Sequence, residues 1–265
     1  MNLIKKDCGI APLDARLLLQ HVLGVSHEEL IKIESVNENQ ERQFLELVER
    51  RKVGEPVAKI VGQKDFWKHS FKTTKDTLDP RPDSETLIEA VLKTCPDSNY
   101  RILDLGIGTG CLLLSLLDEY ENATGVGVDI SDSALEVAKE NAKDLGLEDR
   151  AEFIKSNWTE NVEGKFDIII SNPPYIPTKD IDGLEKEVKD FDPKSALDGG
   201  ESGVDCYEEI ISQIKELLGE NGKVFFEIGQ GQEEDLKNIA AENGFVVGEE
   251  FKDLSGVVRT CLVCF

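Results

Sequence analysis

The chain has 265 residues and carries 53 acidic against 30 basic side chains, a formal net charge of −23. Hydrophobic residues make up 40% and charged residues 31%, proportions of a folded globular protein that exclude disorder over most of the chain. Since nucleic-acid phosphates attract clustered Lys and Arg, this charge argues against direct nucleic-acid binding and favours a small molecule or a positively charged protein partner. The length favours two modest domains over one large domain.

The six cysteines are scattered along the chain, and no apolar run approaches the ~20 residues that span a bilayer. The N-terminal sequence lacks the apolar core and cleavage site of a signal peptide. We therefore expect a cytoplasmic protein with reduced thiols and no membrane association. Cys261 and Cys264 form a C-x-x-C pair, but residues three apart in a strand face opposite sides of a sheet, so we expect no metal site there.

Residues 12–50 show helical periodicity. Leu13, Leu17 and Leu18 recur at helical spacing between Pro12, which suits a helix start, and Gly24, which suits a helix end. A second start follows at Ser26, and a further amphipathic segment reads ERQFLELVERRKV. These patterns predict a small all-helical module.

From residue 56 the chain becomes rich in β-branched and aromatic residues on both sides of a polar, glycine-containing centre, PVAKIVGQKDFWKHSFKTT. This pattern predicts a β-hairpin that joins two domains. Two prolines then exclude a helix, and we expect the next helix to start near Asp83 or Ser84.

Residues 101–265 alternate between predicted strands and helices, which is typical of an α/β sheet covered on both faces. We expect strands at RILDLG, ATGVGVDI, AEFIKS, FDIIIS and KVFFEIG, and a final antiparallel pair at FVVGEEF and GVVRTCLVCF. A long polar insert at about 176–203 interrupts this alternation before a helix at YEEIISQIKELLG. We expect the insert to cover the site.

A glycine-rich turn, Gly106-Ile107-Gly108-Thr109-Gly110, stands where the first of these strands becomes a helix. Glycines let the backbone approach a ligand closely, and the helix N-terminus offers unpaired N–H groups. Asp129 ends the next strand, where this kind of fold binds a ribose diol. Together these features predict a cofactor that carries adenosine, and they leave open a dinucleotide or S-adenosylmethionine.

The sequence Asn172-Pro173-Pro174-Tyr175 follows the apolar strand FDIII, at the strand end where ligands bind in open α/β sheets. Prolines leave carbonyls free to accept hydrogen bonds, the asparagine adds an acceptor, and the tyrosine adds a flat aromatic face. This combination favours a planar NH₂ group, either an amide or an exocyclic amine, and hence S-adenosylmethionine as the cofactor.

In this order and spacing, GIGTG, VDIS and NPPY resemble the class I S-adenosylmethionine-dependent amino-methyltransferases. The resemblance narrows to the release factor glutamine methyltransferase family, because it also includes LDARLLLQHVLG, RKVGEPVAKIVGQKDFW, PRPDSETLIE, FDPKSALDGGESGVDCYEEII and FEIGQGQ. It implies a Rossmann-like seven-stranded sheet at 81–265, a hairpin linker at 56–80, and a helical substrate-recognition domain at 1–55.

Carried over residue by residue, the resemblance implies that the turn from Gly106 to Gly110 wraps the methionine portion of the cofactor. It implies that Asp129 holds the ribose hydroxyls and Trp158 lies against the adenine. The loop from Asn172 to Tyr175 would bind the substrate glutamine and catalyse transfer, with Asn172 also bordering the cofactor. Two positions depart from the family pattern: Asn157 replaces a frequent Asp, and Asp79 replaces a residue that is usually aliphatic.

The implied reaction is methyl transfer to the side-chain nitrogen of the glutamine in the GGQ loop of class 1 release factors. A ribosomal-protein glutamine methyltransferase shares these motifs and remains an alternative. An adenine-N6 nucleic-acid methyltransferase would also use NPPY, but the negative charge argues against it. A non-catalytic module that keeps the cofactor fold is the third alternative, which the complete set of motifs disfavours.

Overall fold

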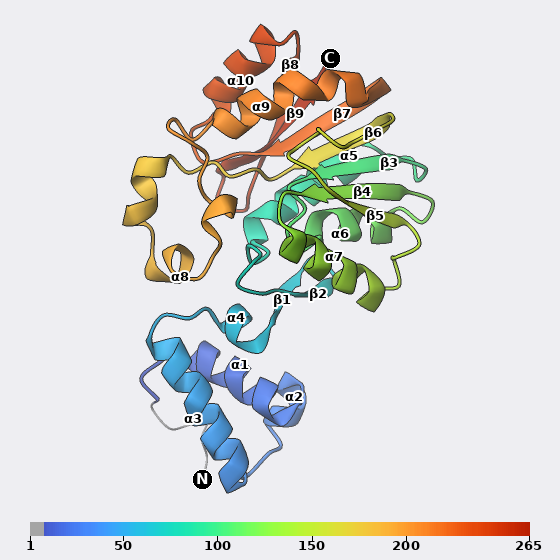
Figure 1. Ribbon diagram of the computed structural model, residues 1–265. Helices are drawn as coiled ribbons and strands as arrows, with labels where there is room; N and C mark the ends of the chain where they lie inside the picture. Colours follow the sequence, from blue (N-terminus) through green and yellow to red (C-terminus); the bar gives the residue numbers. More distant parts are fainter. Residues whose placement is uncertain (1–7) are drawn as a thin grey trace. The chain divides into compact units, whose positions relative to one another are not determined.

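The computed structural model describes residues 8–265, which form two compact units (Figure 1). The first comprises the described residues up to Gln63 together with Glu185–Phe191, and the second comprises Lys64–Leu184 and Asp192–Phe265. Part of the polar insert therefore belongs to the first unit. Residues 1–7 lie outside the described residues. They belong to the expected helical domain and to the N-terminal sequence that lacks the features of a signal peptide.

The first unit, which we call the helical unit, contains α1 (Pro12–Leu23), α2 (His27–Leu30), α3 (Glu38–Lys52), α4 (Val57–Val61) and the short α8 (Lys186–Lys189) of the insert. Pro12 stands in the first turn of α1, and Gly24 ends that helix in the left-handed conformation, as the sequence predicted. Apolar side chains that recur at helical spacing form its core: Leu18, Leu19, Leu30, Phe44, Val48 and Ile60.

The predicted hairpin is shorter than expected and lies further along the chain, at β1 (Gln63–Phe66) and β2 (His69–Lys72). The apolar stretch before Gly62 is helix α4 instead of a strand, because Pro56 precedes its first turn and Gly62 ends it at φ 76°. The turn carries Trp67 at φ 54°, a conformation that L side chains rarely adopt. The backbone N–H of Trp67 donates to Glu85 and its indole N–H to Glu119, at 2.8 and 2.6 Å.

The second unit, which we call the sheet unit, contains a seven-stranded sheet in the order β5-β4-β3-β6-β7-β9-β8. The first four pairings are parallel and the last two are antiparallel. The strands are β3 (Arg101–Leu105), β4 (Thr124–Asp129), β5 (Ala151–Lys155), β6 (Phe166–Ser171), β7 (Leu218–Glu227), β8 (Val246–Lys252) and β9 (Val258–Cys264). This is the Rossmann-like arrangement that the sequence predicted.

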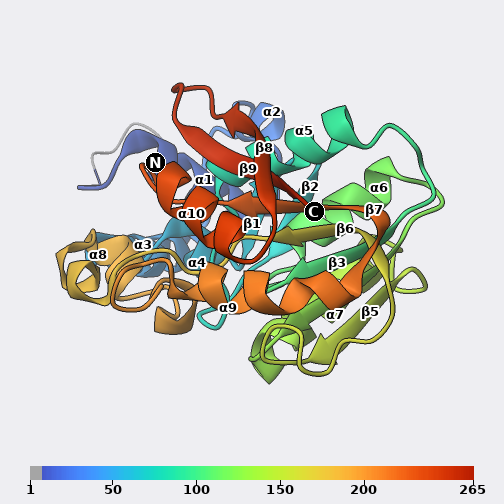
Figure 2. The same ribbon diagram turned by 90° about the horizontal axis from the view of Figure 1, so that it is seen from above.

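Helices cover both faces of the sheet, as Figures 1 and 2 show. One face packs against α5 (Glu85–Thr94), α6 (Cys111–Glu119) and α7 (Asp132–Asp144), and the other against α9 (Asp205–Ile214) and α10 (Glu233–Glu242). The expected helix start near Ser84 is a short 3₁₀ turn, η2 (Pro82–Ser84), that leads into α5. The insert holds only short turns in the sheet unit, η3 (Thr178–Gly183) and η4 (Lys194–Ala196).

The boundary between α9 and β7 also differs from the prediction. Helix α9 stops at Ile214, a 3₁₀ turn η5 (Lys215–Leu217) follows, and β7 begins at Leu218. Phe166 pairs with Leu218 but Ile168 pairs with Lys223, so the residues between form a bulge. Two glycines, Gly219 and Gly222, fit this bulge because their missing side chains leave room against the Phe166 carbonyl.

The terminal cysteine pair faces two ways. Cys261 is fully buried in the core beneath α9 and α10, whereas Cys264 packs against the core on the opposite face. Among residues 8–265, no group of three or more His, Cys, Asp or Glu side chains is placed to hold a metal ion. Every helix in that range is too short or too polar to span a membrane.

Candidate active site

The predicted site residues gather at the carboxyl ends of β3, β4, β5 and β6, around a cavity of about 290 Å³ in the sheet unit. Open α/β sheets bind ligands at this edge. The cavity is lined by these residues of the predicted set: Gly106, Ile107, Gly108, Thr109, Asp129, Trp158, Asn172 and Pro174. Gly110, Pro173 and Tyr175 belong to the same two loops but are not among the described residues that line the cavity.

The glycine-rich turn between β3 and α6 exposes its backbone to the cavity. Gly106, Gly108 and Gly110 all have positive φ angles, of 82°, 54° and 81°. A side chain at Gly108 would meet no atom within 4 Å, so this position faces open space. One at Gly106 would lie 3.5 Å from the Trp158 ring. The turn can therefore bring peptide groups against a bound ligand, which residues with side chains would prevent.

The carboxylate of Asp129 is held by two backbone groups. Its Oδ2 accepts the N–H of Gly108 at 3.0 Å and its Oδ1 accepts the N–H of Ser131 at 2.9 Å. Burial raises the pKa of Asp129, and these N–H donors oppose the shift. Each carboxylate oxygen has two lone pairs, so both retain capacity to accept from a diol.

Trp158 and Asn157 are oriented by Glu209 of α9, a residue that the sequence analysis did not single out. The Trp158 indole N–H donates to Glu209 at 3.1 Å, and the Asn157 amide NH₂ donates to the same carboxylate at 3.2 Å. Trp158 has φ 47°, a rare conformation that places its ring over Gly106. Because the NH₂ end of Asn157 is engaged, its oxygen remains the group that can accept from an adenine amine.

The loop after β6 is fixed from several directions. Ser171 Oγ donates to the Leu105 carbonyl at 2.7 Å, and Asn172 Nδ2 donates to Ser84 Oγ at 3.2 Å. Tyr175 packs against the core beneath α9, and its burial raises its pKa to about 12. Its carbonyl accepts from Gln232 Nε2 at 3.0 Å. The tyrosine therefore supports the loop at the side of the core, and Asn172 and Pro174 form the part that reaches the cavity.

The end of the insert packs directly on this loop. The N–H of Gly199 donates to the Ile176 carbonyl, and the Ile176 N–H donates to the Leu197 carbonyl. An added side chain at Gly199 would come within 2.8 Å of the Pro174 carbonyl and the Tyr175 backbone. The glycine therefore permits a backbone contact that no other residue would allow.

Asp79, the second departure from the family pattern, lines the cavity and is 5% exposed. The hydroxyl of Thr73 donates to its carboxylate at 2.6 Å and also lies 3.2 Å from the Thr77 hydroxyl. The acidic side chain therefore has polar partners inside the protein, which offset the cost of burial.

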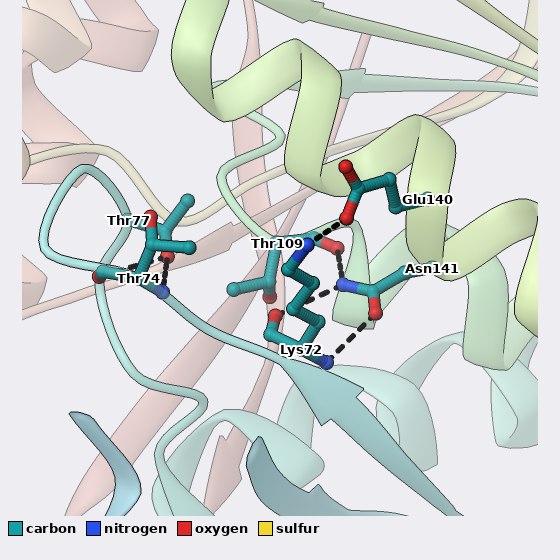
Figure 3. A network of polar contacts seen from close by, with 6 residues as sticks. All are labelled: Lys72, Thr74, Thr77, Thr109, Glu140 and Asn141. Carbon is teal, nitrogen blue, oxygen red and sulfur yellow. Dashed lines mark hydrogen bonds and ion pairs between the residues drawn. The ribbon is translucent and has the colours of Figure 1, made fainter. Parts of the chain in front are cut away.

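A buried amide connects the glycine-rich turn to the hairpin (Figure 3). Asn141 of α7 donates to the carbonyls of Thr109 and Lys72, at 2.8 and 3.0 Å, and accepts the Lys72 N–H at 2.7 Å. All hydrogen-bonding groups of this side chain except one lone pair are used. Nothing in the sequence distinguished this asparagine from other polar residues on α7.

Two buried polar side chains lie next to Asn172. Ser84 of η2 is 3% exposed, and Glu227, the last residue of β7, is 2% exposed. Burial raises the pKa of Glu227 to about 7, whereas Ser84, Arg259 and Asn172 favour its ionised form. Its Oε2 has no hydrogen-bond partner among the described residues. Ser84 lies in the motif PRPDSETLIE and Glu227 in FEIGQGQ, two of the motifs that carry the family resemblance, but neither motif indicates a role for these residues. Only their positions could have indicated a role: Glu227 ends a central strand, and Ser84 directly precedes helix α5 at the site.

The comparisons with known proteins agree with this architecture. Residues 73–186 match the methyltransferase small domain, and residues 2–62 match the PrmC N-terminal domain. Among solved structures, a ribosomal protein L11 methylase from Lactobacillus delbrueckii subsp. bulgaricus has a TM-score of 0.51 at 21% identity, over 70% of this chain and 81% of that one. A methyltransferase from Pyrococcus furiosus also has a TM-score of 0.51, at 20% identity over 67% of this chain and 80% of that one. These likenesses show the fold.

Sequence relatives identify the family. The release factor glutamine methyltransferase of Rhodospirillum rubrum is 47% identical over 252 residues, which cover 94% of this chain and 77% of that protein. That of Agrobacterium fabrum is 43% identical over 250 residues, which cover 92% and 86%. The chain therefore belongs to the release factor glutamine methyltransferase family.

Proposed function

We propose that this protein transfers a methyl group from S-adenosylmethionine to the side-chain nitrogen of the glutamine in the GGQ loop of class 1 release factors. The observation that carries the proposal is the placement of Asn172 beside the glycine-rich turn. Its amide NH₂ donates to Ser84 and its side chain lines the cavity, so its oxygen is the end available to a substrate.

The cavity suits the cofactor. The Gly106–Gly110 turn offers peptide groups to the methionine portion, Asp129 offers a carboxylate to the ribose, and Trp158 offers a ring to the adenine. When bound, S-adenosylmethionine supplies an electrophilic methyl group on a positively charged sulfur. We include Ile107 and Thr109 in the cofactor site because they line the same wall.

The side chains orient the substrate nitrogen. An amide nitrogen is a poor nucleophile because its lone pair is delocalised into the carbonyl. Hydrogen bonds from its NH₂ to the Asn172 oxygen and the Pro173 carbonyl would stabilise the positive charge that develops during transfer. Alignment of the reactants contributes further, and no general base is required because the cationic amide loses its proton readily. Pro174 and Tyr175 would hold this loop and border the substrate.

The substrate class draws support from charge and from the helical unit. A net charge of −23 would complement a release factor surface that is built to meet ribosomal RNA. We assign recognition of the release factor to the helical unit, and we place the reaction in the cytoplasm without direct nucleic-acid binding. If binding of the release factor proved insensitive to ionic strength, the electrostatic part of this proposal would be wrong.

Mass spectrometry tests the function. A purified class 1 release factor is incubated with this protein and S-adenosylmethionine, beside a release factor whose GGQ glutamine is replaced by alanine. One added methyl group on the GGQ glutamine, absent from the control, is expected. Cofactor binding without methylation would refute the release factor as substrate, and ribosomal proteins and then nucleic acids would be assayed next.

A further inference from the structure

The register of the sheet places Asn172 next to Glu227. Strands β6 and β7 run parallel with Ser171 opposite Phe226, so the next residue of each strand is Asn172 on one and Glu227 on the other. Glu227 is 2% exposed and pairs across its other edge with Thr260 of β9. An acidic side chain that is this deeply buried requires hydrogen-bonding partners.

The polar side chains that face this carboxyl group are Ser84 and Asn172, and as donors both favour its ionised form. Glu227 Oε2 has no hydrogen-bond partner among the described residues, so it can accept a further hydrogen bond from a neighbouring donor. Asn172 Nδ2 itself donates to Ser84 Oγ at 3.2 Å, which holds the two side chains together beside the carboxyl group. An ionised carboxylate only accepts hydrogen bonds, so the end of the Asn172 amide that faces it must be the NH₂ group. The oxygen of the same amide then points away from Glu227.

We propose that Glu227 is a positioning residue of this site, whose carboxylate, together with Ser84, holds the Asn172 amide with its oxygen available to the substrate NH₂ group. The inference rests on the proposed function, in which that oxygen accepts a substrate hydrogen. Glu227 acts through Asn172 and has no contact with the reacting atoms.

The positioning depends on the charge of Glu227. Burial raises its pKa to about 7, so it changes protonation near neutral pH. Arg259 of β9 favours its ionised form, and Asp83 of η2 disfavours it. The other titratable groups facing it are the Tyr175 and Tyr207 hydroxyls and the Cys111 thiol. Once protonated, Glu227 becomes a donor, and it then stabilises the inverted Asn172 amide, in which the oxygen faces inward.

The test compares Glu227→Gln with wild type and with Glu242→Gln, an exposed carboxylate at the end of α10. The glutamine side chain has the same shape, but it does not titrate and it can donate as well as accept. We expect kcat to fall about 10- to 100-fold, the effect of losing one hydrogen bond to a charged group. We expect cofactor Kd to change less than about threefold, because the cofactor-binding wall is untouched. In wild type and Glu242→Gln, kcat should rise with pH through about 7, and this rise should be absent in Glu227→Gln.

A second readout requires no substrate. In protein labelled with ¹⁵N at asparagine, the Asn172 side-chain NH₂ signal, identified by its loss in Asn172→Ala, should shift with pH around 7 in wild type. It should not shift in Glu227→Gln. Turnover decides the proposed function and this signal decides the positioning role, so that either can fail alone.

The serine offers an independent variant in case Glu227→Gln does not fold. Ser84→Ala removes the hydroxyl that links the amide to the carboxylate, and Ser84→Thr restores it. We expect kcat to fall in the first and to recover in the second. The inference is overturned if the Asn172 signal and kcat are the same in Glu227→Gln as in wild type, or if kcat and cofactor affinity fall equally, which would indicate a merely structural role.

Discussion

Asn141 and Thr109 are joined by a hydrogen bond of 2.8 Å from the Asn141 amide to the Thr109 carbonyl. This bond links the last turn of α7 to the glycine-rich turn, and the same amide holds both backbone groups of Lys72 at the end of β2. The shape of the turn at the cavity therefore depends on a side chain that does not line the cavity, and the hairpin shares that support (Figure 3).

Replacement of Asn141 by alanine should weaken both stability and cofactor binding. The substitution removes three hydrogen bonds, and the backbone groups of Thr109 and Lys72 that made them lose their partner. We expect the free energy of unfolding to fall by about 2–4 kcal/mol. Asn141→Asp should lose the bonds to both carbonyls because a carboxylate has no N–H. Chemical denaturation and calorimetric titration with S-adenosylmethionine would measure the two effects.

The neighbouring residue Glu140 provides the control. It is exposed and forms an ion pair with the Lys72 side chain, so Glu140→Gln should change the free energy of unfolding by less than about 1 kcal/mol. Cofactor affinity that is unchanged in Asn141→Ala would show that the glycine-rich turn keeps its shape without this bond.

Gly199→Ala should lower turnover more than it lowers cofactor affinity. Its new methyl group would collide with the Pro174 carbonyl and the Tyr175 backbone at 2.8 Å, which forces the substrate loop to move. We expect kcat to fall about tenfold or more, because misplacement by a fraction of an ångström is costly when catalysis depends on alignment. Steady-state kinetics with a release factor would measure it.

Gly183→Ala is the matched control in the same insert, since a side chain there would meet no atom within 4 Å. Equal kinetics for the two glycine variants would mean that the insert does not constrain the Asn172–Tyr175 loop.

Asn172→Ala should abolish turnover while cofactor binding weakens only moderately. The side chain borders the cavity, but the glycine-rich turn, Asp129 and Trp158 remain to hold the cofactor. Calorimetry and single-turnover assays on the same preparation would separate binding from chemistry. If both were lost to the same degree, the division between cofactor-binding and substrate-binding residues would be incorrect.

The buried Asp104 should make stability decrease as pH rises. Burial raises its pKa from 3.8 to about 8, and neither of its carboxylate oxygens has a hydrogen-bond partner among the described residues. Between these values the folded protein retains a proton that the unfolded chain has lost, so the free energy of unfolding falls with increasing pH. In Asp104→Asn this contribution is absent. The difference in the free energy of unfolding between the variant and wild type should therefore shift in favour of the variant as the pH rises from about 4 to about 8.

Denaturation curves at several pH values would measure that difference, with the exposed Asp149→Asn as control. The free energies of unfolding of the two proteins are compared by their change with pH and not by their absolute values. Parallel curves for wild type and Asp104→Asn would show that Asp104 ionises in the folded protein as readily as in the unfolded chain.

Much of the fold follows from local pattern. Pro12, Gly24 and the leucines between them define α1, and the alternation after residue 100 predicts the parallel sheet. The prediction of secondary structure was wrong where the same residues fit both a strand and a helix pattern. The apolar run at 57–61 suits a strand or a helix, and the backbone turns at Pro56 and Gly62 decided for the helix. Residues 219–222 suited neither the predicted helix nor a regular strand.

The site could be located from sequence because its loops stand at strand ends. Gly106, Asp129 and Asn172 end or follow three parallel strands, and parallel strands bring their carboxyl ends to one edge. The residues that orient them were not identified. Glu209 orients Trp158 from α9, and Ser84 orients Asn172 from a segment 88 residues earlier.

The sequence by itself determined the order of elements, the α/β class and the loops that form the cavity, because local spacing and backbone preferences encode them. Only the tertiary structure decided which ends of the Asn172 and Asn141 amides are engaged, and that Glu227 lies buried beside Asn172. Such contacts join residues far apart in the chain through hydrogen bonds whose geometry exists only once the sheet and its helices have packed. That geometry cannot be read from local sequence patterns.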